Sequence, residues 1–206
     1  MLTLFIATGN TNKVQEIGAT LNELGIKHIE LVDFSAYPSY TPPQENGNTF
    51  AENAIIKAQA AALYSQKATL ADDSGLEVLA LNGAPGIFSA RFAGAGHNDA
   101  ANNAKLLTML ADTPAQNRQA AFVCVLALAL PNRQFWLAKG RVEGIILETP
   151  RGEGGFGYDP LFYLPEYGLS MAELSQKEKN RISHRALALK KALPLINNLN
   201  NFNRNN

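Results

Sequence analysis

The sequence has little of what several classes of protein depend on. It contains one cysteine, Cys124, and three histidines in 206 residues. A single cysteine cannot form an intramolecular disulfide, which favours a reducing compartment, and so few scattered histidines argue against a zinc site. Cys124 lies inside the apolar run "AAFVCVLALAL", where we expect it to pack in a core.

Net charge and long apolar runs are also absent. Lysine plus arginine number 18, and aspartate plus glutamate number 18, so no basic excess is available to bind nucleic acid or an anionic membrane. The run 120–130 is much shorter than the ~20 apolar residues of a spanning helix. The N-terminal "MLTLFIATGN" lacks the basic segment of a secretory signal. We therefore expect a cytoplasmic protein with no nucleic acid and no membrane partner.

The apolar pattern predicts one α/β domain over 1–206. Strands are expected over 2–7, 28–32, 68–75, 76–81, 118–130, 134–147 and 161–165, and helices over 13–24, 50–66, 98–113 and 180–199, the last interrupted or ended near Pro194. Thr49 and Glu52 have the spacing of a capping box. A hairpin between two long β-type runs, mixed with strand-helix crossovers, predicts a mixed central sheet flanked by helices. The Asn-rich tail 197–206 is expected to be frayed.

The turn "ATGNTNK" between the first strand and the first helix is a candidate anion site. Backbone N–H groups at a helix start point toward the positive end of the helix dipole. Lys13 in the first turn adds a full positive charge. The turn is neither a P-loop nor a GxGxxG motif, so a helix start that Asn and Thr merely cap is the alternative.

Two adjacent carboxylates, Asp72 and Asp73, end a predicted strand and precede Ser74 and Gly75. Taken alone, Asp-Asp-Ser-Gly is also ordinary turn chemistry. Glu45 stands in a long loop, and strand ends at one edge of an α/β sheet form a ligand crevice, where these carboxylates can meet. Like charges at one point need a cation among them, and oxygen ligands suit Mg²⁺ or Mn²⁺. A Mg²⁺ beside a helix terminus indicates phosphate chemistry.

Three further segments carry candidate ligand contacts. Lys57 on the second helix faces phosphate if that helix flanks the crevice, and is otherwise a solvated lysine. In "GGFGYDP", the glycines allow close backbone approach and Phe156 offers a face for a planar base, against the alternative of a tight connection with a core aromatic. "KEKNRISHRA" collects basic residues at the start of the last helix, where they oppose the dipole and suggest an anionic or carbonyl-bearing ligand.

Together these segments resemble one family, the inosine/xanthosine triphosphatases, often called HAM1-like. The motifs that carry the resemblance are "TGNTNK", "TFAENAIIKA", "ADDSGLEV", "GAPGIFSAR", "GGFGYDPLF" and "SHRALAL", in family order over nearly the whole chain. The resemblance implies two lobes around a substrate cleft and a homodimer. It implies a Mg²⁺-dependent pyrophosphatase, with Mn²⁺ as a substitute, that converts ITP, dITP and XTP to the nucleoside monophosphate and pyrophosphate.

The resemblance also implies roles for individual residues. Asp73 would be the general base and a metal ligand, with Glu45 and Asp72 as further ligands. The expected phosphate contacts are Thr8, Gly9, Asn10, Thr11, Asn12, Lys13 and Lys57, and Ser74 is a further substrate contact. The expected base and sugar contacts are Phe156, Gly157, Tyr158, Asp159, Lys179, His184 and Arg185.

One position departs from the family pattern, and two other functions stay open. The residue after Glu45 is Asn46, where the family commonly has threonine, so we expect the loop to differ locally while the glutamate itself is retained. A house-cleaning pyrophosphatase for other modified nucleotides would differ in substrate ranking. A non-catalytic nucleotide-binding module would bind without turnover.

Overall fold

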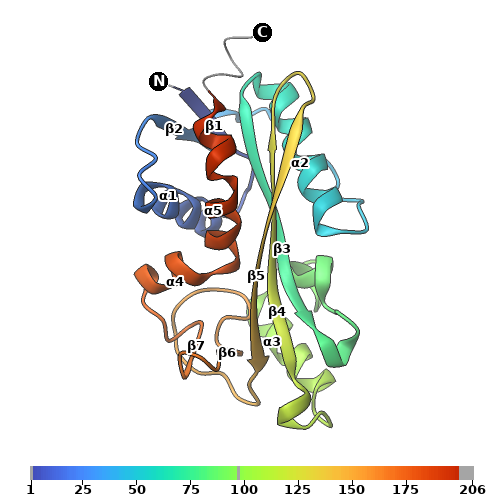
Figure 1. Ribbon diagram of the computed structural model, residues 1–206. Coiled ribbons are helices and arrows are strands. Elements are labelled where there is room, and N and C mark those ends of the chain that lie inside the picture. The colour runs from blue at the N-terminus through green and yellow to red at the C-terminus, as the bar shows by residue number, and fades with distance from the viewer. Residues whose placement is uncertain (1, 97, 200–206) are drawn as a thin grey trace. The chain divides into compact units, whose positions relative to one another are not determined.

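The computed structural model describes residues 2–96 and 98–199. Within these residues, seven strands form one sheet in the order β2-β1-β3-β4-β5-β6-β7 (Figure 1). The strands are β1 Leu2–Ile6, β2 Ile29–Val32, β3 Ala68–Val78, β4 Gln119–Ala129, β5 Phe135–Ile146, β6 Phe162–Leu164 and β7 Leu169–Ser170. The helices are α1 Thr11–Glu23, α2 Phe50–Ser65, α3 Asp99–Met109, α4 Gln176–Ile182 and α5 His184–Asn197.

The sheet is mixed and open, which confirms the predicted α/β class. β1 is parallel to β2 and to β3, whereas β6 is antiparallel to β5 and to β7. The neighbouring strands β4 and β5 are joined by a short turn in which Leu130 N donates to Gln134 O over 2.9 Å, as the predicted hairpin requires.

The chain divides into two compact units. Unit 1 comprises the described residues of Met1–Asp73, Cys124–Gly140 and His184–Asn206, and unit 2 those of Ser74–Val123 and Arg141–Ser183. The prediction of a single two-lobed domain stays a prediction. Of the tail expected to be frayed, Asn197 ends α5 and Leu199 is buried, and 200–206 lie outside the described residues.

In unit 1, apolar side chains alternate along the strands and so supply cores on both faces of the sheet. Leu4 and Ile6 of β1 pack in a core with Ile17 of α1 and Leu189 of α5, and Phe5 between them packs against other aromatic rings. α1 and α5 lie on one side of β3 and α2 lies on the other (Figure 1). Cys124 belongs to the first of these cores, as predicted.

Unit 2 has its own core around α3. Leu106 of α3 and Leu110, which caps the end of α3, pack with Leu76 of β3 and with Phe122 and Phe162. The two phenylalanine rings lie 4.3 Å apart between centroids. The helix begins where predicted, because the Asn98 side chain accepts a hydrogen bond from Ala101 N.

Helix caps account for the start of α2. The Thr49 hydroxyl accepts from Glu52 N over 3.1 Å, but the Glu52 carboxylate accepts from Asn48 N, one residue before the cap. The predicted capping box is therefore half formed. A complete capping box occurs instead at Ser175 and Glu178, at the start of α4.

The acidic pair does not end a strand, so that prediction was wrong. A single strand β3 runs from Ala68 to Val78, and residues 79–81 form a short 3-10 helix in place of a second strand. Gly75 does not serve a turn. A Cβ at Gly75 would overlap Ser89 Oγ, whose hydroxyl accepts from Leu76 N over 2.9 Å, so glycine permits close packing within the strand.

The closing helix also differs from its prediction. It breaks at Ser183, which has extended backbone, into α4 and α5, and α5 continues through Pro194. Lys179 and Arg181 consequently lie in the last turn of α4, where positive charge is favourable to the helix dipole rather than opposed to it. Across the described ranges, the helices are all too short or too polar to cross a bilayer.

Candidate active site

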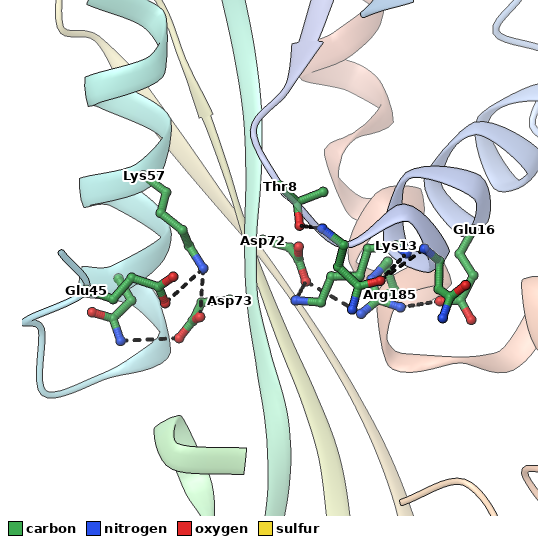
Figure 2. A network of polar contacts seen from close by, with 11 residues as sticks. Thr8, Lys13, Glu16, Glu45, Lys57, Asp72, Asp73 and Arg185 are labelled. Atoms are coloured by element: carbon green, nitrogen blue, oxygen red, sulfur yellow. Dashed lines mark hydrogen bonds and ion pairs between the residues drawn. The ribbon is translucent and has the colours of Figure 1, made fainter. Parts of the chain in front are cut away.

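Asp72 and Asp73 point to opposite sides of β3 (Figure 2). Successive side chains of a strand alternate between the two faces of a sheet, so this follows from their place in mid-strand. Asp73 faces α2, and Asp72 faces α1 and α5. The structure therefore brings Asp73 together with Glu45, and it places Asp72 in a different cluster.

The Asp73 cluster is built around one lysine. Lys57 Nζ of α2 lies 2.8 Å from Asp73 Oδ1 and 3.1 Å from Glu45 Oε2. Asn53, one helical turn before Lys57, donates from Nδ2 to Asp73 Oδ2 over 3.4 Å and accepts from Gly47 N over 2.9 Å. Asn53 thus ties the loop that carries Glu45 to the aspartate.

Aromatic rings pack the same loop against other elements of unit 1. Phe34, Tyr37 and Tyr40 pack around Phe5 of β1, with centroid distances of 5.7, 4.7 and 6.1 Å. Tyr40 also packs against Tyr64 of α2 at 5.0 Å. The segment between β2 and α2 is consequently anchored to β1 and to α2 before it reaches Glu45.

Charge and burial compete at Asp73. Burial raises the pKa of the Asp73 carboxyl, Lys57 opposes that shift, and the nearby charge of Glu45 reinforces it, so the pKa lies above its ordinary value. Burial alone would lower the pKa of Lys57, but the charges of Asp73, Asp72 and Glu45 outweigh it and the pKa is raised. At neutral pH Lys57 is therefore a cation beside a carboxylate that is more basic than usual.

The Asp72 cluster is more deeply buried. Lys13 Nζ lies 2.8 Å from Asp72 Oδ2, and Arg185 Nη2 lies 3.5 Å from the same oxygen. Arg185 also forms an ion pair through Nη1 with Glu16 of α1. The side chains of Asp72 and Arg185 are 0% and 2% exposed. Burial would raise the pKa of Asp72, but Lys13, Arg185 and Lys57 hold it well below its usual range.

The predicted phosphate turn has the geometry of a capped helix start. Asn10 Oδ1 accepts from Asn12 N and Lys13 N over 3.0 and 3.3 Å, and Thr8 Oγ1 accepts from Asn10 N over 3.2 Å. Gly9 to Asn12 are exposed. The Asn10 cap therefore satisfies two backbone N–H groups at the N-terminus of α1, as the alternative of a capped helix start requires, and anion binding by this turn stays a prediction.

In unit 2, the "GGFGYDP" loop forms a third polar cluster. Asp159 Oδ2 accepts from Lys179 Nζ over 2.6 Å and from Phe156 N over 3.0 Å. Lys179 Nζ also lies 4.9 Å from the centroid of the half-buried Phe156 ring. The Tyr158 hydroxyl donates to Ser89 O over 2.9 Å.

Gly157 in this loop is held by one helix. Gly157 N donates to Asp99 Oδ2 over 2.7 Å, and Gly157 O accepts from Asn103 Nδ2 over 2.9 Å. Both partners belong to α3. Ser74, the remaining predicted contact of unit 2, is half-buried in β3 next to Asp73.

His184 and Arg185 belong to unit 1, whereas the other predicted base contacts belong to unit 2. Both are buried at the start of α5. Arg185 is engaged by two carboxylates, and its role as a base contact stays a prediction, as does that of His184.

Sequence reasoning missed two residues of these clusters. Asn53 precedes Lys57 by four positions on α2, a spacing that puts both side chains on one helix face, so helical periodicity could have indicated it. Glu16 follows Lys13 by three positions in the same way, but only the fold brings Arg185 to it. Within the described ranges, no group of three or more histidine, cysteine, aspartate or glutamate residues is placed to hold a metal ion.

The fold and these clusters define a class: an α/β protein in which two partly buried lysines, Lys13 at the N-terminus of α1 and Lys57 on α2, pair with carboxylates of β3, an arrangement suited to phosphate. The family follows from comparison with known proteins. The model of the Ham1 family matches residues 4–195, and the chain belongs to that family.

Relatives match over nearly their whole length. The dITP/XTP pyrophosphatase of Desulforamulus reducens is 53% identical over 95% of this chain and 96% of that protein. The dITP/XTP pyrophosphatase of Geobacillus kaustophilus is 51% identical over 93% and 92%. Among solved structures, a HAM1 protein from Coxiella burnetii has a TM-score of 0.86 and 41% identity, covering 96% of this chain and 99% of that one.

Proposed function

We propose that this protein is a nucleoside triphosphate pyrophosphatase that converts ITP, dITP and XTP to the nucleoside monophosphate and pyrophosphate. Such an activity removes deaminated purines from the nucleotide pool. The observation that carries the proposal is the Asp73, Lys57 and Glu45 cluster in a chain about half identical to dITP/XTP pyrophosphatases over almost its full length.

Asp73 is the general base of the proposed reaction. It accepts a proton from the attacking water at a carboxylate oxygen, and its raised pKa makes it a stronger base than an exposed aspartate. Before substrate binds, Lys57 keeps the carboxylate ionised, and Asn53 orients it through the second oxygen. That attack occurs between the α and β phosphates rests on the family resemblance.

The donor set fits Mg²⁺. Oxygens of Glu45 and Asp73 converge on a single cationic group, the Lys57 ammonium, and oxygen donors from one or two carboxylates, completed by water and phosphate, are what Mg²⁺ takes in phosphate enzymes. Bound there, Mg²⁺ or Mn²⁺ would lower the pKa of water and offset charge on the leaving pyrophosphate. Asp72 as a further ligand stays a prediction, because its carboxylate lies in the other cluster.

The remaining substrate contacts belong to the same proposal. Lys13 and the exposed turn 8–12 bind phosphate oxygens, and Lys57 assists them. Phe156, Asp159 and Lys179 contact the base and sugar. Hypoxanthine and xanthine carry a carbonyl acceptor at the purine 6-position, whereas adenine carries an amino donor, so donors in the site distinguish them. A buried polar site can discriminate by ~10⁴ against an analogue that leaves its groups unpaired. A homodimer and a cytoplasmic location stay predictions.

A substrate panel tests the proposal. Turnover of ITP, dITP, XTP, GTP, ATP and dTTP with Mg²⁺ is measured, and pyrophosphate and orthophosphate are scored separately. We expect pyrophosphate from the first three, with little from the others. Preference for dTTP would support a house-cleaning enzyme of other specificity, and binding without turnover would support a non-catalytic module.

A further inference from the structure

Lys57 lies between the two carboxylates that are proposed to hold the divalent cation (Figure 2). Its ammonium is 2.8 Å from Asp73 Oδ1 and 3.1 Å from Glu45 Oε2, and its side chain is 14% exposed. One positive group thus satisfies both carboxylates from within the protein.

An ammonium and a divalent cation cannot both bind these oxygens without strong repulsion, because like charges at partly buried positions are weakly screened. The ammonium has to move, and its flexible four-carbon stem permits this. A phosphate oxygen offers it a new charge-assisted hydrogen bond.

We propose that Lys57 is the internal counter-cation of the Glu45 and Asp73 carboxylates, and that its transfer to phosphate couples phosphate binding to divalent cation binding. The inference rests on the proposed function, since it assumes that this site takes a metal and a phosphate. By thermodynamic reciprocity, bound phosphate raises the affinity for the cation by the same factor as the bound cation raises the affinity for phosphate. The protein therefore takes up a divalent cation poorly until a phosphate is present.

Lys13 provides a matched control within the same unit. It carries the same charge and also belongs to the proposed phosphate site, but it pairs with Asp72 on the other side of β3. Replacing Lys13 by methionine removes one positive charge without clearing the space between Glu45 and Asp73. A general field effect would appear in both variants, whereas a local exchange would appear only at Lys57.

The experiment measures Mn²⁺ binding from the electron paramagnetic resonance of free Mn²⁺, with and without pyrophosphate. Wild type, Lys57→Met and Lys13→Met are compared at pH 8. We expect Lys57→Met to bind Mn²⁺ alone about tenfold more tightly than wild type, corresponding to ~1.4 kcal/mol, and Lys13→Met to change less. Pyrophosphate also binds Mn²⁺ directly, and this contribution is the same for all three proteins. The informative quantity is the additional gain in Mn²⁺ affinity that pyrophosphate gives wild type, and Lys57→Met should lose that gain.

Three results would overturn the proposal: unchanged or weaker Mn²⁺ binding in Lys57→Met, an equal gain in Lys13→Met, or the same gain from pyrophosphate in wild type and Lys57→Met. Lys57→Gln, a neutral side chain that can donate to both carboxylates, replaces Lys57→Met if circular dichroism shows misfolding. ITP turnover by wild type is measured on the same preparation. Turnover without the coupling contradicts this inference alone, and coupling without turnover contradicts the proposed function alone.

Discussion

The buried ion pairs of Arg185 predict a large and specific loss of stability. Arg185→Met removes a guanidinium that is 2% exposed and paired with Glu16 and Asp72. Removing one partner of a buried pair typically costs 3–5 kcal/mol, because the remaining charge is left uncompensated. Asp72 keeps Lys13 at 2.8 Å, which places the expected cost at the lower end, about 3 kcal/mol.

Urea unfolding followed by circular dichroism measures this cost. With an m-value of about 2 kcal/mol per molar urea, the midpoint should fall by roughly 1.5 M. Arg151→Met is the matched control, because Arg151 pairs with Glu173 at 3.1 Å but is 42% exposed, and exposed pairs contribute about 0–1 kcal/mol.

Glu16→Gln completes a double-mutant cycle. It leaves Arg185 with Asp72 at 3.5 Å, so we expect it to cost less than Arg185→Met. The loss of stability in the double variant should be smaller than the sum of the two single losses by about 0.5–3 kcal/mol, as for residues in direct contact. Equal midpoints for Arg185→Met and Arg151→Met, or strict additivity in the cycle, would refute the reasoning.

Three further predictions concern the site and the core. Glu45→Gln should raise the Mg²⁺ concentration needed for half-maximal ITP turnover, and an unchanged metal titration would remove Glu45 from the ligands. Phe156→Ala should raise KM for ITP by roughly 5- to 150-fold, the equivalent of about 1–3 kcal/mol of lost stacking, whereas a fall in kcat alone would count against base stacking. Burial raises the pKa of Cys124 to about 12, so the folded protein should resist thiol alkylation at pH 8 and react once unfolded in urea; rapid labelling of the folded protein would contradict that burial.

The order of elements from β1 to α2 and from α3 to β6 was predictable, because hydrophobic periodicity and helix caps act locally. The long runs around Cys124 and the start of α2 at Thr49 are examples, and both appear in the structure. The length of β3 was not predictable, because Asp-Asp-Ser-Gly favours a turn by local propensity. The hydroxyl of Ser89, 13 residues beyond Leu76 in the chain, accepts a hydrogen bond from Leu76 N, which allows the strand to continue.

The same misjudged strand explains what the sequence could not show about the candidate site. Adjacent aspartates at a strand end can share a cation, but in mid-strand they face apart, so Asp72 and Asp73 acquire different partners. From the sequence, Arg185 was predicted to be a contact of the base, because a charged residue in a motif gives no indication of whether its side chain is buried. Its pairing with Glu16 spans 169 positions, and only tertiary structure produces it.

The most direct test of the account is product release from ITP by wild type, Asp73→Asn and Asp112→Asn, the last a control at an exposed aspartate. Wild type and Asp112→Asn should release inosine monophosphate and pyrophosphate in equal amounts. Asp73→Asn should fold normally and be slower by about 10²–10⁴, the usual contribution of a general base. Near-normal turnover by Asp73→Asn, or orthophosphate as the product of wild type, would contradict the central claim.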